Sequence, residues 1–89
     1  MRREIPEAEA WLRDLGEYAE WRPEGVTATP LEMIEALRAG EGLSPEVRDG
    51  FLEDLEAVAA LVDPDRVGSF DVYRALRALK AALASRADG

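Results

Sequence analysis

The sequence predicts an all-α protein, a compact bundle of four short helices, and two observations carry this prediction. Apolar residues recur at the three- and four-residue spacing of a helix face in four segments, and no segment shows the alternation of a half-buried strand. Three segments also begin at a proline, which suits the first helical turn because its missing N–H has no partner there. Short connections fit an up-down bundle or a pair of orthogonal hairpins, and the pattern does not choose between them.

The first helix is expected over residues 6–22. Pro6 opens it, and Glu7 and Glu9 place negative charge in the first turn, where the helix dipole favours it. Gly16 weakens the helix by about 1 kcal/mol relative to alanine. The expected apolar face consists of Ala8, Trp11, Leu15 and Tyr18.

The second and third helices have the clearest start signals. Thr29 and Glu32 form a capping box, in which each side chain satisfies a backbone N–H of the first turn, and this helix is expected to stop at Gly40. Ser44 caps the third helix, expected over residues 45–62. Their apolar faces are Leu31, Met33, Ile34 and Leu37 in the second helix and Val47, Phe51, Leu55, Val58 and Val62 in the third, widened by Leu52, Ala59 and Leu61.

The fourth helix is expected over residues 70–85, with Ser69 as its cap. Its apolar stripe is Val72, Leu76, Leu79 and Leu83. Residues 1–89 are expected to form a single domain, with a frayed tail from about residue 85.

The residue types that are missing exclude most catalytic chemistry. The chain has no Cys and no His, which removes thiolate nucleophiles, the commonest general base and the commonest transition-metal ligands. We therefore expect no enzymatic activity and no cofactor. Asn and Gln are absent too, and ten of the eleven basic residues are Arg, a composition typical of thermophiles, with a halophilic source as the alternative.

The formal net charge of −8 disfavours direct binding of nucleic acid or of anionic membrane surfaces. Residues 1–62 hold fifteen acidic and six basic side chains, whereas residues 63–89 hold four and five. The amino terminus lacks the apolar core of a signal peptide, and no run is long enough to span a membrane, so a cytoplasmic location is expected.

The stretch DPDRVGSFDVYR, residues 63–74, has part of the ligand pattern of a calcium loop. Asp63, Asp65, Ser69 and Asp71 stand at positions 1, 3, 7 and 9, and Gly68 stands at position 6. The stretch resembles an EF-hand, over about 29 residues from Phe51 to Leu79. The resemblance implies a hard-cation site formed by Asp63, Asp65, Ser69 and Asp71.

Two departures oppose that reading. Val67 at position 5 has no side-chain oxygen, and Arg74 replaces the bidentate glutamate at position 12. A cation at that corner repels the ion. We favour an ordinary turn between two helices and keep a degenerate EF-hand-like cation site as the alternative.

Two features are candidates for binding another protein. Trp21 is expected near the end of the first helix, at the edge of its apolar face, and Trp is enriched among the residues that dominate interfaces. Arg74, Arg77 and Lys80 form a basic strip opposite the leucine stripe of the fourth helix. Each feature also has a purely structural interpretation. Trp21 closes the end of the bundle, and the basic strip is a solvated helix face.

The acidic faces of the first three helices also have two interpretations. They keep the domain soluble, or they attract a basic partner by long-range steering. The residues concerned are Glu7, Asp14, Glu17, Glu20, Glu35, Glu53, Asp54 and Glu56.

The prediction from the sequence is a non-enzymatic, acidic, helical protein–protein interaction module that acts as a regulator, adaptor or accessory subunit. Two alternatives to this module stay open: a protein that binds a hard cation at the EF-hand-like stretch, and an acidic inhibitor that mimics nucleic acid and blocks a basic partner. The sequence leaves association between copies of the chain open.

Overall fold

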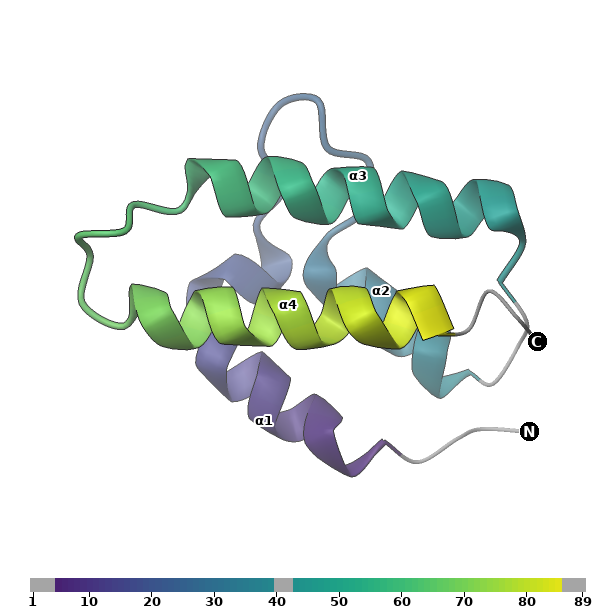
Figure 1. Ribbon diagram of the computed structural model, residues 1–89, viewed down its shortest axis with the longest axis horizontal. Helices are drawn as coiled ribbons and strands as arrows, with labels where there is room; N and C mark the ends of the chain where they lie inside the picture. Colours follow the sequence, from purple (N-terminus) through teal and green to yellow (C-terminus); the bar gives the residue numbers. More distant parts are fainter. Residues whose placement is uncertain (1–4, 40–42, 86–89) are drawn as a thin grey trace.

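The computed structural model of the chain describes residues 5–39 and 43–85. Its elements are α1 (Pro6–Leu15), the 3₁₀ helix η1 (Gly16–Glu20), α2 (Pro30–Arg38), α3 (Pro45–Leu61) and α4 (Ser69–Ser85), shown in Figure 1. The described residues contain no strand, and the predicted all-α bundle of four helices is confirmed. The predicted stop at Gly40 and the tail beyond residue 85 lie outside the described residues.

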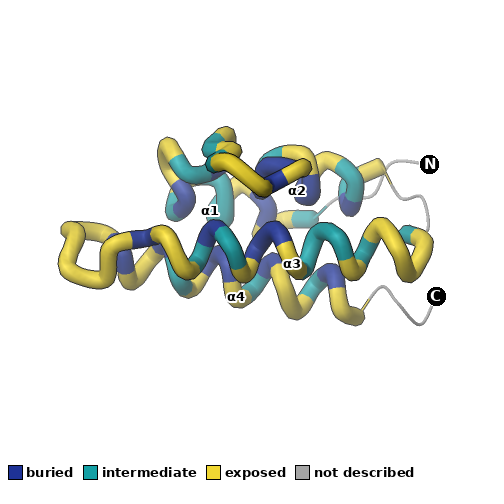
Figure 2. Tube along the Cα trace, turned by 90° about the horizontal axis from the view of Figure 1, so that it is seen from above, coloured by how far each residue is buried: buried dark blue, intermediate teal, exposed yellow. Residues whose placement is uncertain are grey.

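The helices form two layers. α3 and α4 run side by side in opposite directions (Figure 1), and α1, η1 and α2 cover one face of this hairpin (Figure 2). The shortest dimension of the Cα trace, 18 Å, fits two layers whose helix axes lie about 8–10 Å apart. Among the elements that the structure describes, none covers the opposite face of the α3–α4 hairpin.

The core lies between the two layers. The predicted stripe of α4 is buried throughout, and α4 packs against α1, α2 and α3. Burying one such side chain contributes about 1.5–3 kcal/mol. The buried apolar residues are Ala8, Leu15, Ala19, Val26, Ala28, Met33, Ile34, Leu37, Leu55, Val58, Val62, Val72, Ala75, Leu76, Leu79 and Leu83.

Within the described residues, no helix combines the length and the apolar character required to cross a bilayer.

The predicted starts of α2 and α3 are confirmed. The Thr29 Oγ1 accepts a hydrogen bond from the Glu32 N–H at 3.2 Å, and the Glu32 Oε1 accepts one from the Thr29 N–H at 3.1 Å. The Ser44 Oγ accepts a hydrogen bond from the Val47 N–H at 3.2 Å. These bonds join residues three apart, so the local sequence alone decides them.

The first helix is shorter than predicted. It ends at Leu15 rather than near residue 22, because Gly16 adopts φ = 56° and ψ = −127°, which lies outside the helical region. The chain then continues as the 3₁₀ helix η1. Tyr18 and Trp21 consequently do not extend the face of α1, and Trp11 and Tyr18 are only half-buried.

Three further predictions about helix residues are wrong. Ser69 is the first residue of α4 rather than its cap, because its Oγ donates to the Pro64 carbonyl at 2.9 Å while the Gly68 carbonyl accepts the first helical N–H bonds. Val47 and Leu61 were expected on the apolar face of α3, but they are exposed, and each lies in a terminal turn of the helix.

Asp54 was expected on a solvated acidic surface and is instead buried, with 9% of its surface exposed. Its Oδ1 accepts a hydrogen bond from the Thr27 N–H at 3.3 Å, and its Oδ2 accepts one from the Ala28 N–H at 3.0 Å. Both donors precede α2, so this carboxylate fixes the loop before α2 to the middle of α3. The contact spans more than twenty residues of chain, and no local pattern announces it.

We predict opposite effects for alanine at two glycines. Gly16→Ala should lower the free energy of unfolding by about 1–3 kcal/mol, because alanine is strained at this positive φ even though no atom crowds an added Cβ. Gly50→Ala, inside α3 with equally open space, should raise it by about 0.5–1 kcal/mol. Urea unfolding measures both, and a stabilising Gly16→Ala would show that the helix does not end there.

We predict that Asp54→Ala lowers the free energy of unfolding by about 2–3 kcal/mol, because it leaves two backbone N–H groups without their charged acceptor. The control is Glu24→Ala, which removes an exposed carboxylate from the loop before α2 and should change stability by less than about 0.5 kcal/mol. Equal effects in urea unfolding would contradict the role assigned to Asp54.

Candidate protein-interaction surface

An apolar groove of about 230 Å³ runs along the open face of the hairpin. Neither α1, η1 nor α2 contributes to its lining, which places it on the side of α3 and α4 that the second layer leaves uncovered. The lining residues are Leu55, Glu56 and Ala59 of α3 and Tyr73, Leu76, Arg77 and Lys80 of α4. We call this feature the α3–α4 groove.

The floor of the α3–α4 groove is held in place by the core. Leu55 and Leu76 are buried, and the half-buried Tyr73 and Ala59 form the walls beside them. The Tyr73 hydroxyl donates a hydrogen bond to the Val62 carbonyl at 2.5 Å, which ties α4 to the end of α3. The groove is thus a preformed apolar surface, since its floor cannot move without disturbing the core.

The two rims of the groove carry opposite charges. Glu56 lines the groove on the α3 side, and the exposed Glu53 lies one helical turn before it, next to the lining rather than within it. Arg77 and Lys80 line the α4 side with the same three-residue spacing. Lys80 Nζ and Glu56 Oε1 are 3.4 Å apart and connect the rims. In the part of the chain that the structure describes, Arg77 and Glu53 form neither an ion pair nor a hydrogen bond.

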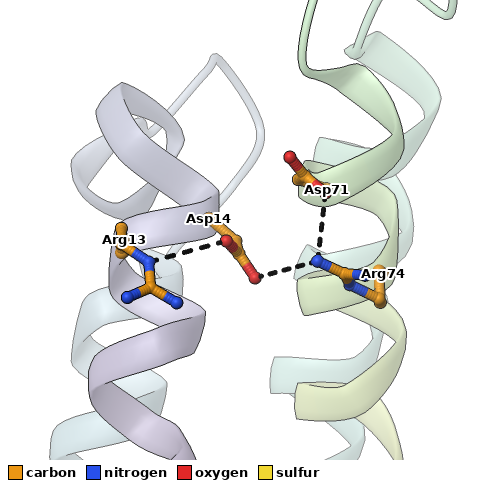
Figure 3. Close-up of polar contacts among 4 residues, drawn as sticks. All are labelled: Arg13, Asp14, Asp71 and Arg74. Atoms are coloured by element: carbon orange, nitrogen blue, oxygen red, sulfur yellow. Dashed lines mark hydrogen bonds and ion pairs between the residues drawn. The ribbon is translucent and has the colours of Figure 1, made fainter.

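Arg74, the third member of the predicted basic strip, has a different environment. Its guanidinium lies 3.0 Å from Asp71 and 3.6 Å from Asp14, so it links α4 to α1, as Figure 3 shows. It also lies 5.9 Å from the centre of the Phe70 ring. The structure brings Arg77 and Lys80 to the groove and directs Arg74 to the contact between α1 and α4.

Trp21 lies apart from the α3–α4 groove, just after η1 in the second layer. It is half-buried and packs edge-on against Tyr18, with the ring centres 5.2 Å apart. Arg66 also contacts Tyr18, with its guanidinium 5.4 Å from the centre of the Tyr18 ring and a 2.8 Å hydrogen bond donated to the Tyr18 hydroxyl. Trp21 and the basic strip therefore do not share one surface.

Arg66 also pairs with Glu17, and this hydrogen bond, aided by Tyr18, raises the pKa of the guanidinium above its ordinary value. The contact joins the loop between α3 and α4 to η1. Together with Arg74 and Asp14, it shows that part of the acidic surface predicted for the first helices is occupied by contacts within the chain.

Three of the four side chains named in the EF-hand-like stretch are engaged in local contacts, and Asp65 takes part only through its backbone N–H. The Asp63 Oδ1 accepts a hydrogen bond from the Asp65 N–H at 2.9 Å, Ser69 is buried and bonded to the Pro64 carbonyl, and Asp71 pairs with Arg74. Gly68 has φ = 86° and lets the chain turn into α4. Across residues 5–39 and 43–85, no cluster of three or more acidic side chains is arranged to hold a metal ion.

The sequence reasoning missed an exposed apolar tip at the turn between α3 and α4. Val67 is 98% exposed, Phe70 is 75% exposed and Leu61 is 56% exposed. The helical period could have predicted that Phe70 is exposed, because it lies about 160° around the helix from Val72, opposite the buried stripe. No comparable signal marks Val67.

Comparisons of the chain with protein-family models, with curated proteins and with solved structures gave no match.

We predict that Phe70→Ser changes the free energy of unfolding by less than about 0.5 kcal/mol, because the ring is mostly exposed. Leu79→Ala, in the buried stripe of the same helix, should cost about 2–5 kcal/mol. Urea unfolding compares the two variants. A loss above about 1 kcal/mol for Phe70→Ser would show that the tip is packed in solution.

Proposed function

We propose that this chain is a non-enzymatic protein–protein interaction module, a small regulator, adaptor or accessory subunit, which binds another protein through the α3–α4 groove. The observation that carries the proposal is a preformed apolar floor beside an exposed arginine that has no ion-pair partner in the described part of the chain. The cytoplasmic location expected from the sequence belongs to this proposal.

The groove has the mixture of surfaces that interfaces use. A partner side chain that covers Tyr73 and Ala59 removes apolar area from water, while Arg77 offers a planar guanidinium to a carboxylate or a carbonyl on the partner. Arginine and tyrosine are enriched at the centres of protein interfaces, where water is excluded and a charged hydrogen bond is strengthened. A contact of this kind gives both affinity and register.

The inventory of side chains supports a binding role over a catalytic one. The chain has no imidazole and no thiol, and the groove holds one carboxylate, Glu56, which is already paired with Lys80. The hydroxyl of Tyr73 is used by the Val62 carbonyl. What the groove offers a ligand is apolar contact and the charge of Arg77.

We predict that Arg77→Glu lowers recovery of the bound protein at least tenfold when the tagged chain is isolated from its host cells. The control is Arg13→Glu, which makes the same change of net charge at a side chain of α1 that is 80% exposed. Both variants should keep the unfolding midpoint of the parent chain. Equal recovery with the two variants would reject the α3–α4 groove as the contact surface.

The same isolation at increasing salt separates the proposal from an acidic inhibitor of a basic partner. Binding through the groove depends on apolar contact and should persist between 0.1 and 0.5 M NaCl. Binding through the general acidic surface should fall steeply over that range and should weaken little with Arg77→Glu.

A further inference from the structure

The charges on the rims of the α3–α4 groove are arranged so that the face complements itself. The α3 rim is acidic through Glu56, which lines the groove, and through the exposed Glu53 one turn before it, outside the lining. The α4 rim is basic through Arg77 and Lys80, which both line the groove. One charge on each rim, Glu53 and Arg77, has no ion-pair partner among the residues that the structure describes. A ligand that satisfies both rims must carry a basic ridge and an acidic ridge side by side.

A second copy of the chain presents such a pair of ridges when the two molecules meet about a two-fold axis parallel to α3 and α4. This rotation sets α3 of one copy over α4 of the other, so that each acidic rim faces a basic rim. A two-fold axis in the plane of the face but perpendicular to the helices would set α3 over α3 and oppose like charges. The charge pattern therefore selects one of the two isologous arrangements.

The positions of the charged residues along the helix axes agree with this arrangement. The Lys80–Glu56 pair shows that these two residues lie within side-chain reach of each other along the hairpin, and Arg77 lines the same groove as Glu56. Arg77 lies three residues from Lys80, about 4.5 Å along the helix axis. A rotation about an axis parallel to the helices preserves these positions, so Arg77 of one copy comes within side-chain reach of Glu56 in the other, and Lys80 comes within reach of Glu53.

We propose that the α3–α4 groove binds a second copy of this chain, forming an isologous dimer in which the Arg77–Lys80 rim of each copy meets the Glu53–Glu56 rim of its partner. This inference rests on the proposed function, because it names the occupant of the same groove. The apolar floors of the two grooves face each other in this dimer, which adds burial to a domain too small to hold a large core.

The net charge of −8 on each copy opposes the dimer at long range. At 0.15 M ionic strength, charges farther apart than about 8 Å are largely screened. The rim charges meet at shorter distances and are less affected. The local complementarity therefore dominates at physiological ionic strength.

Charge reversal on each rim tests the dimer. Sedimentation velocity at 0.15 M NaCl should show the parent chain dimerising, and Arg77→Glu and Glu56→Arg should each raise the dissociation constant at least tenfold. An equimolar mixture of the two variants should recover association as a heterodimer, because it restores an opposite charge at both contacts. Native mass spectrometry identifies the heterodimer, since the two variants differ in mass.

The controls are Arg13→Glu and Glu9→Arg on α1, which change the net charge by the same amounts on exposed side chains of the other layer. They should dimerise like the parent chain. Circular dichroism confirms that all variants are folded.

Two results would overturn the inference. A parent chain that stays monomeric at 1 mM would do so, and it would leave the proposed function standing if Arg77 is still required for recovery of another protein. A mixture of Arg77→Glu and Glu56→Arg that fails to associate would show that the rims do not face each other.

Discussion

The structure depends on the burial of one face of α4 against three other helices. Val72, Leu76, Leu79 and Leu83 occupy that face, and α1, α2 and α3 all contact it. An α-helix has about 3.6 residues per turn, so only part of its surface can face the core. With the leucine face buried, Tyr73, Arg77 and Lys80 lie beside α3 at the edge of the core. The α3–α4 groove is thus a geometric consequence of how α4 is packed.

The helix starts could be predicted from the sequence because their chemistry is local. Thr29 and Ser44 each bond to an N–H three residues away, and nothing elsewhere in the chain alters that contact. The end of α1 was harder to predict, since Gly16 is compatible with a weakened helix and with a break, and only the packed structure decides. The layer arrangement depends on contacts between distant residues such as Asp54 and Ala28, which no periodic pattern encodes.

The candidate surface was predicted in part for the same reason. The helical period correctly placed Arg74, Arg77 and Lys80 on one side of α4, but it could not show which neighbour each side chain meets. Arg74 lies against α1 and pairs with Asp14, whereas Arg77 stays free of ion pairs within the described residues. The α3–α4 groove is formed by side chains of both helices, so the sequence of one helix alone cannot predict it.

The turn between α3 and α4 separates the acidic part of the sequence from the part that is not acidic. The excess of acidic residues ends at residue 62, and α3 ends at Leu61, so the change in charge coincides with the turn of the hairpin. A short loop bonded to itself through Asp63 and Ser69 then returns the chain alongside α3. An acidic helix and a basic helix are consequently held side by side with an apolar seam between them. This arrangement gives the face an acidic side and a basic side, so a charged partner can bind it in only one favourable orientation. A uniformly acidic bundle of the same size would not distinguish orientations in this way.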